Sequence, residues 1–241
     1  MQTSTNRLPA LFLIGDSIVK TGTPPGDTGP WGWGYELAPL FDAAKIQVHN
    51  EGRGGRSSRS YIEEGVWATM REQLAPGDFV IIHFGHNDAK NSQNYPDRTT
   101  VAGNGDEAQE IESPVTHKKE MIHSYGWYLR QYVKDIQAKG ATAIICSSVP
   151  RDTWVDGKIK RGFDGYAGWA AEAAKNSGAL FLDLNTLAAN RFDALGQEQM
   201  AKYFADNQHP TKAGARLNAE VIVEGLKGLK GCPLAGYLRA D

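Results

Sequence analysis

The chain has 241 residues, which is long enough for one large α/β domain and too short for two full-sized domains joined by a linker. Its 41% hydrophobic and 22% charged residues are typical of a globular protein with a sizeable core, which excludes the disordered, collagenous and coiled-coil classes. The net charge of -2 argues against nucleic acid as the main partner, because phosphate binding needs a basic surface.

We therefore expect one domain over residues 1–241. The most apolar early stretch, 10–14, is far shorter than the ~20 residues that span a bilayer, and no signal-like segment precedes it, so no membrane partner is expected. The sequence leaves open whether an export signal was removed or the protein works in the cytoplasm. Two cysteines, Cys146 and Cys232, lack the number and spacing of a disulfide framework or a metal site and are expected to be structural thiols.

Short apolar runs recur along the chain and predict strands that are buried on both faces. These runs are 11–14, 46–48, 79–82, 143–146 and 180–182. Between the third and fourth runs, apolar and aromatic residues at three- and four-residue steps predict a crossover helix over 121–136. This alternation predicts a parallel sheet with helices on both faces and a binding crevice at the carboxyl ends of the strands.

Residues 91–116 form a polar segment without a clear period. Loops longer than ~12–15 residues are uncommon in compact domains and are often lids or binding loops. We therefore place this segment at the rim of the site, with a passive surface insertion as the alternative.

The first predicted strand ends in Gly15-Asp16-Ser17. A small residue permits a tight turn after the strand, which would expose the hydroxyl of Ser17 at the top of the sheet. The alternative is an ordinary helix start, with Asp16 or Ser17 as its cap.

The second predicted strand is followed by a glycine-rich stretch, 50–61. Glycines allow a backbone N–H to approach a ligand closely, as an oxyanion donor requires, whereas neither phosphate-binding glycine spacing is present. Arg53, Arg56 and Arg59 suit an anionic polymer, and exposed arginines or salt bridges explain them equally well.

The third predicted strand leads into Asn87, whose amide would lie beside the same crevice. The alternative is a turn-forming asparagine. A metal site at His83 and His86 is disfavoured, because residues three apart on an extended chain point to opposite faces. No metal is expected.

Near the C-terminus, Asp206 and His209 precede a helix pattern that begins around Thr211. A catalytic histidine needs a partner that fixes its tautomer, and an aspartate three residues earlier in a turn can supply it. A serine, a glycine turn, an asparagine and an Asp-x-x-His pair in this order predict acyl transfer by a serine nucleophile.

These four blocks resemble those of the SGNH (GDSL-type) hydrolase superfamily. Gly-Arg-Ser-x-Arg-Ser-Tyr and Phe-Gly-His-Asn-Asp are similar to its rhamnogalacturonan acetylesterase branch, and the similarity runs from about residue 11 to 223. The resemblance implies a three-layer α/β/α flavodoxin-like fold with a central parallel sheet of about five strands. It also implies a secreted or periplasmic serine esterase, without metal or cofactor, that removes acetyl groups from plant cell-wall polysaccharide, above all pectic rhamnogalacturonan.

The resemblance also implies a role for individual residues. Ser17 would be the nucleophile, His209 the base and Asp206 its orienting partner. The oxyanion hole would consist of the N–H groups of Ser17 and Gly55 and the amide of Asn87, where the choice of Gly55 over Gly52 and Gly54 depends on aligning Gly-Arg-Ser.

Aromatic and amide groups at the expected rim suit a sugar chain better than a lipid. That rim comprises Trp31, Trp33, Asn91, Gln93, Asn94, Tyr95 and Arg98. We predict Trp31, Trp33, Arg56 and His86 as substrate-binding residues, although both tryptophans suit packing at a helix start equally well. The competing functions are an acetyl-xylan or general short-chain acyl esterase, a lipase or thioesterase of the same fold, and a carbohydrate-binding module without catalysis.

Overall fold

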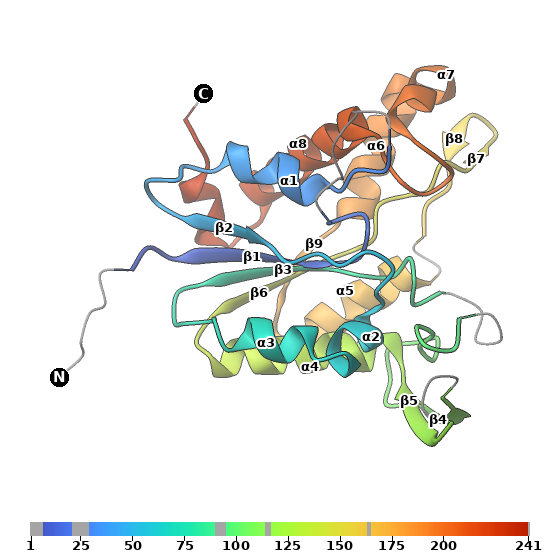
Figure 1. Cartoon of the computed structure of the whole chain (residues 1–241). Helices are drawn as coiled ribbons and strands as arrows, with labels where there is room; N and C mark the ends of the chain where they lie inside the picture. The colour runs from blue at the N-terminus through green and yellow to red at the C-terminus, as the bar shows by residue number, and fades with distance from the viewer. Residues whose placement is uncertain (1–6, 21–28, 90–94, 114–116, 163–164, 241) are drawn as a thin grey trace.

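The computed structural model describes residues 7–20, 29–89, 95–113, 117–162 and 165–240. Within them, five parallel strands form a central sheet in the order β2-β1-β3-β6-β9, with helices on both faces (Figure 1). The strands are β1 (Ala10–Gly15), β2 (Gln47–Asn50), β3 (Phe79–His83), β6 (Thr142–Cys146) and β9 (Leu180–Leu182). This order is that of the flavodoxin-like doubly wound sheet, in which the order of the strands reverses between β1 and β3. The predicted fold class is therefore confirmed.

The two helical layers cover opposite faces of the sheet (Figure 1). One layer contains α1 (Trp33–Leu37), α6 (Leu184–Leu195) and α8 (Lys212–Gly228). The other contains α2 (Ser58–Glu63), α3 (Val66–Arg71), α4 (Tyr125–Ala138) and α5 (Tyr166–Ser177). Short helical turns complete the chain: η1 (Ala38–Leu40), α7 (Gln197–Met200), η2 (Ala201–Tyr203) and η3 (Pro233–Tyr237).

Strand β1 shows why the predicted strands are continuous apolar runs in the sequence. Leu11 and Leu13 pack into the core on one face, whereas Phe12 and Ile14 pack into the core on the other. Each fully buried aliphatic or aromatic side chain of this kind contributes about 1.5–3 kcal/mol. Strand β2 differs, because it forms an edge of the sheet and its residues are exposed or half-buried, so the prediction of burial on both faces is wrong there.

The predicted helix over 121–136 begins later than expected. Residues Lys119–His123 form strand β5, and α4 starts at Tyr125 after Ser124, whose side chain accepts a hydrogen bond from the Trp127 N–H. Met121, which the predicted apolar stripe included, is 54% exposed. The helix therefore begins after the capping residue Ser124, and the apolar residues before it belong to strand β5.

The polar segment 91–116 contains regular structure in its described part, 95–113. Strand β4 (Ala108–Glu112) pairs antiparallel with β5, and Lys119 Nζ bonds to Glu110 Oε1 across the hairpin at 2.7 Å. The prediction of a loop without a period was wrong here, because a strand that is exposed on both faces shows no alternation of apolar residues. Residues 91–94 and 114–116 lie outside the described residues.

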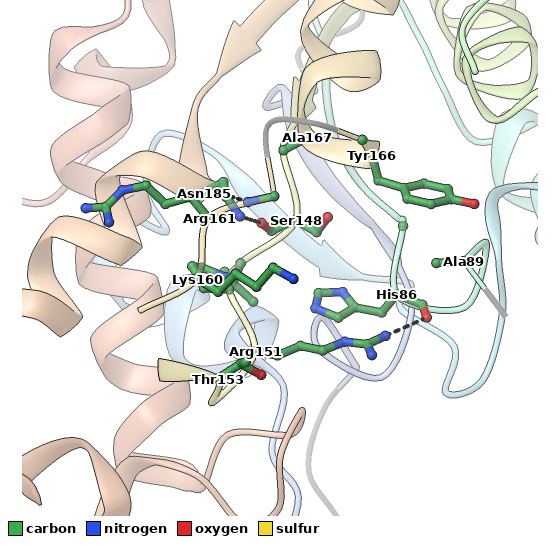
Figure 2. Close-up of a pocket in the computed structure, with 15 residues that line it drawn as sticks. His86, Ala89, Ser148, Arg151, Thr153, Lys160, Arg161, Tyr166, Ala167 and Asn185 are labelled. Atoms are coloured by element: carbon green, nitrogen blue, oxygen red, sulfur yellow. Dashed lines mark hydrogen bonds between the residues drawn. The ribbon is translucent and has the colours of Figure 1, made fainter. Parts of the chain in front are cut away.

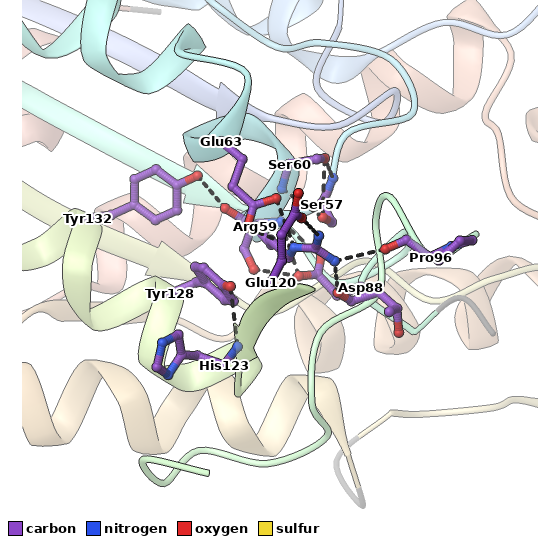
Figure 3. A network of polar contacts seen from close by, with 12 residues as sticks. Ser57, Arg59, Ser60, Glu63, Asp88, Pro96, Glu120, His123, Tyr128 and Tyr132 are labelled. Carbon is purple, nitrogen blue, oxygen red and sulfur yellow. Dashed lines mark hydrogen bonds and ion pairs between the residues drawn. The ribbon is translucent and has the colours of Figure 1, made fainter. Parts of the chain in front are cut away.

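Arg59 ties this segment to the body of the molecule (Figure 3). It lies on α2, is 1% exposed, and donates to the carbonyl oxygens of Pro96 (2.8 Å) and Thr99 (3.1 Å). The guanidinium also pairs with Glu63 at 2.8 Å and with Glu120 of β5 at 3.4 Å. A buried cation needs such partners, because leaving it unpaired is strongly destabilising.

Sequence reasoning missed a second hairpin, formed by β7 (Trp154–Val155) and β8 (Lys158–Ile159). Asp156 and Gly157 connect its strands with φ of 50° and 74°, as a two-residue type I′ turn requires. The Asp-Gly pair was the available signal in the sequence.

Candidate active site

The serine and the histidine that sequence reasoning selected lie within hydrogen-bond distance of each other. Ser17 Oγ is 2.9 Å from His209 Nε2, and His209 Nδ1 is 2.8 Å from Asp206 Oδ2. Ser17 follows β1 at the switch point of the sheet, where crevices of this fold form. This hydrogen-bonded chain is the arrangement that lets an imidazole withdraw a proton from a serine.

Local contacts fix the aspartate in its position. Asp206 Oδ1 accepts the backbone N–H groups of Gln208 and His209, both at 2.7 Å, so the turn that carries the histidine also orients the carboxylate. Burial raises the pKa of Asp206, but the N–H groups of His209 and Gln208 and the imidazole outweigh it and hold that pKa below its ordinary value. The carboxylate is therefore ionised at neutral pH.

The turn after β1 presents the Ser17 hydroxyl without starting a helix. Asp16 Oδ1 accepts the Ile18 N–H at 2.8 Å, and the Asp16 carbonyl accepts the Lys20 N–H at 3.0 Å. A Cβ at Gly15 would lie 2.4 Å from the His83 carbonyl oxygen, so only glycine fits where this turn leaves the sheet. Asp16 caps the turn, and Ser17 stays half-buried beside His209.

The glycine turn and the asparagine after β3 lie next to each other. Asn87 Nδ2 donates to the Arg56 carbonyl at 3.0 Å. The Gly52 N–H bonds to Asn50 Oδ1, whereas the N–H groups of Ser17, Gly54 and Gly55 bond to no other part of the chain that the structure describes. Gly52 is thereby excluded as an oxyanion donor, whereas the N–H groups of Gly54 and Gly55 are both available, and the choice of Gly55 stays a prediction.

A buried pair lies directly behind these groups. His86 Nδ1 is 3.7 Å from Asp16 Oδ2, and both side chains are almost fully buried. Burial lowers the pKa of His86 well below its ordinary value, and burial raises the pKa of Asp16 to about 7, against the Ile18 N–H bond, which lowers it. His86 is thus uncharged at neutral pH. The carboxyl group of Asp16 gains or loses its proton at a pH close to neutral.

We expect Asp16→Asn to become more stable relative to wild type as pH rises. A carboxyl whose pKa rises on folding stabilises the protein fully below its unfolded pKa, ordinarily 3.8, and loses that contribution up to its folded pKa of about 7. The neutral amide has no such loss, so the difference in Tm should shift by about 5 °C in favour of the variant between pH 5 and pH 8. Thermal melts of both proteins measure this, and a constant difference would show that Asp16 keeps its ordinary pKa.

The expectation that His83 and His86 point to opposite faces was wrong. Their rings stack with centroids 6.0 Å apart, because β3 ends at His83 and Gly85 turns the chain with φ of 134°. Even so, within the described ranges no three His, Cys, Asp or Glu side chains are grouped to hold a metal ion.

The predicted substrate-binding residues separate into distinct environments. Trp33 is 0% exposed and packs edge-on against His83, so it is a core residue and its predicted contact with substrate is wrong. Trp31 is 7% exposed, and its backbone N–H donates to the carbonyl of Pro210, next to His209. The Arg56 guanidinium pairs with Glu64 at 2.8 Å, which favours the salt-bridge interpretation for this arginine.

Sequence reasoning missed the segment that follows β6. The Asp152 N–H bonds to the carbonyl of Asn207 at 2.9 Å, and Asn207 Nδ2 bonds to the Asp152 carbonyl at 2.9 Å. The turn of His209 is therefore supported by residues 151–153. Their position after the fourth strand of the sheet was the signal that could have identified them.

Comparisons with known proteins identify the family of the chain. The model of the GDSL-like Lipase/Acylhydrolase family matches residues 13–217. A rhamnogalacturonan acetylesterase of Emericella nidulans is 30% identical over 230 residues, which cover 93% of this chain and 89% of that protein. A probable rhamnogalacturonan acetylesterase of Bacillus subtilis, YesY, is 32% identical over 231 residues, with 93% and 94% covered.

Solved structures share the fold at lower identity. Protein YXIM of Bacillus subtilis superposes with a TM-score of 0.74 at 24% identity over 93% of this chain, which spans only 58% of that protein. A variant of Axe2, an acetyl xylan esterase of Geobacillus stearothermophilus, superposes with a TM-score of 0.63 at 18% identity over 97% of both chains. Among the described residues, no helix is long and apolar enough to cross a membrane. The family match over most of its length establishes that the chain is a carboxylic ester hydrolase and belongs to the GDSL-like lipase/acylhydrolase family.

Proposed function

We propose that this protein is a serine carbohydrate esterase that removes O-acetyl groups from pectic rhamnogalacturonan. The observation that carries the chemistry is the hydrogen-bonded chain of Ser17, His209 and Asp206. Two relatives that cover nearly the whole chain at 30% and 32% identity are named rhamnogalacturonan acetylesterases, which supports the choice of substrate. Since such a polysaccharide lies outside the cell that degrades it, we infer a secreted or periplasmic enzyme.

In the first half of the proposed reaction, neutral His209 accepts the proton of Ser17 as Oγ bonds to the acetyl carbon. Asp206, ionised and bonded to Nδ1, stabilises the imidazolium that forms. The imidazolium then donates its proton to the departing sugar oxygen, which leaves an acetyl group on Ser17. In the second half, His209 activates a water that releases acetate and restores the serine.

The negative charge that develops on the acetyl oxygen needs donors that are already in place. We assign this role to the N–H groups of Ser17 and Gly55 and to the amide of Asn87. The first two lack other partners within the described residues, and Asn87 is held against the glycine turn by its bond to the Arg56 carbonyl.

Acetylxylan is the second candidate substrate. Axe2, which shares the fold, is an acetyl xylan esterase, and three further structures are catalytic mutants of that esterase with a serine, an aspartate or a histidine replaced by alanine. Measuring acetate release from acetylated rhamnogalacturonan, pectin and xylan fragments decides between them. A higher kcat/KM on rhamnogalacturonan is expected, and equal or higher values on xylan would contradict the proposal.

Asn87→Ala should lower kcat by about 10²–10³ while KM changes little, because an oxyanion donor acts mainly in the transition state. Kinetics with p-nitrophenyl acetate and a thermal melt on the same preparation test this assignment. A turn-forming Asn87 would instead lower Tm with a small loss of activity. An unchanged kcat would therefore remove Asn87 from the oxyanion hole.

The segment 91–116 is proposed to form the rim of the site. In its described part, Arg98 lies over Gly55, since a Cβ on that glycine would be 3.3 Å from Arg98 Nη1. Arg98 also lies over the ring of Tyr95 at 5.5 Å, so the two residues bring a cation and an aromatic ring next to the glycine turn. Such groups suit a sugar chain that passes over the nucleophile.

A further inference from the structure

A cavity of about 610 Å³ is lined by His86, whose Nδ1 lies 3.7 Å from Oδ2 of Asp16, the residue before Ser17 (Figure 2). Its volume lies within the range of small-ligand sites, ~300–1,000 Å³. Its lining also includes Arg151 and Thr153. The segment that contains Arg151 and Thr153 is also bonded to the turn of His209 through Asn207, so an occupant of the cavity would lie next to the catalytic turn.

Two cations line this cavity, and only Arg151 is close enough to a buried carboxyl group, that of Asp16, to lower its pKa against the larger effect of burial. The side chains of Arg151 and Lys160 extend toward His86 (Figure 2), and the Arg151 guanidinium donates to the His86 carbonyl at 3.3 Å. Over the described part of the chain, neither cation forms an ion pair, and no Asp or Glu lines the cavity.

A third cation at the cavity, Arg161, differs from these two because it has partners within the protein. Arg161 lines the cavity with part of its chain, but its guanidinium turns away from Arg151 and Lys160 (Figure 2). It bonds to Asp193 and Asn190, each at 2.8 Å. Arg161 is thus paired within the protein, whereas Arg151 and Lys160 form no ion pair with any residue that the structure describes.

We propose that this cavity is an anion subsite in which Arg151 and Lys160 hold a uronate carboxylate of the sugar chain while a neighbouring acetyl group reaches Ser17. This inference rests on the proposed function and extends it, because it makes a charged sugar a determinant of substrate choice. A planar guanidinium can bind a carboxylate through two parallel hydrogen bonds, and an ammonium adds a point charge. Rhamnogalacturonan carries one carboxylate on each galacturonate unit, whereas the xylan backbone is neutral.

The test compares an acetylated rhamnogalacturonan oligosaccharide with the same oligosaccharide after its carboxyl groups are reduced to alcohols. We expect the wild-type kcat/KM to fall about tenfold on reduction, mainly through KM, as loss of a charge-assisted hydrogen bond predicts. Lys160→Gln should remove most of this preference, and Arg151→Gln should do the same. Equal kcat/KM values of the wild type on both forms would overturn the subsite and leave the proposed esterase function standing.

Lys158→Gln is the matched control. Lys158 lies in β8, two residues before Lys160, but outside the cavity lining, and its Nζ is 4.0 Å from Asp193 Oδ2. The Lys158→Gln variant should keep the wild-type preference for the acidic oligosaccharide over the reduced one. An equal loss of preference in Lys158→Gln and Lys160→Gln would overturn the specific assignment in favour of a general surface charge effect.

Calorimetric binding of an unacetylated galacturonate oligomer provides a readout that needs no catalysis. The wild type should bind it, and Lys160→Gln and Arg151→Gln should each weaken binding about tenfold. If the wild type releases no acetate from rhamnogalacturonan but binds the oligomer through these two residues, the proposed function fails and the subsite stands. Binding that is unchanged in both variants would overturn the subsite.

Discussion

Ser17→Ala is expected to reduce esterase turnover by about 10⁶, the scale that follows removal of the nucleophile from a serine triad. The substitution deletes one oxygen, the one that lies 2.9 Å from His209 Nε2. That oxygen is the atom to which the acetyl group is transferred, and an alanine offers no replacement. Steady-state turnover of p-nitrophenyl acetate and of the acetylated polysaccharide measures the loss.

The fold should survive this change. Ser17 is half-buried in a turn whose backbone bonds are made by Asp16, so circular dichroism and Tm should match the wild type. Ser177→Ala is a suitable control, because it also deletes one hydroxyl, which bonds to the Ala173 carbonyl within α5. That variant should remain active, and near wild-type turnover of Ser17→Ala would mean that another group is the nucleophile.

Asp206→Asn is expected to lower kcat by up to ~10⁴ with little change in structure. The asparagine keeps an oxygen for the N–H groups of Gln208 and His209, which Asp206 Oδ1 now accepts. Its amide replaces a carboxylate that bonds to His209 Nδ1, which favours the wrong tautomer and removes the charge that stabilises the imidazolium. The kcat of both proteins at neutral pH gives the magnitude.

Asp42→Asn controls for the loss of a carboxylate in a comparable turn. Asp42 Oδ1 accepts the Ala44 N–H two residues on, and Oδ2 pairs with Lys45 three residues on. Its replacement should leave kcat unchanged. If Asp206→Asn lowers kcat by less than tenfold, Asp206 only shapes the turn, and other groups orient His209.

The sequence allowed the sheet and the positions of the chemical groups to be predicted because both follow from strand ends. Ser17 and Asn87 follow two strands that are neighbours only after the chain folds, and the general rule for parallel sheets was enough to place them at one edge. The same rule, applied after β6, would have identified Arg151. Apolar runs thus carried most of the information about the architecture.

The failures occurred where local turns or tertiary packing override a pattern. Gly85 reverses the extended geometry that was assumed for His83 and His86. Trp33 belongs to a short helix that packs against α8, so its ring fills the core, although its glycine-rich surroundings suggested an exposed rim. No periodicity indicates either outcome, because both depend on which elements pack together.

The buried guanidinium of Arg59 has a consequence for how the rim of the site moves. Its Nη1 donates to the carbonyls of Pro96 and Thr99, so this part of the rim cannot detach without leaving buried N–H groups of Nη1 without those partners, while Nε keeps its bond to Glu63. We therefore expect the backbone amides of Thr99 and Val101 to exchange with deuterium in one cooperative opening together with those of α2. A sugar chain would then bind to a preformed rim, and its affinity would not be reduced by the entropy of ordering that segment.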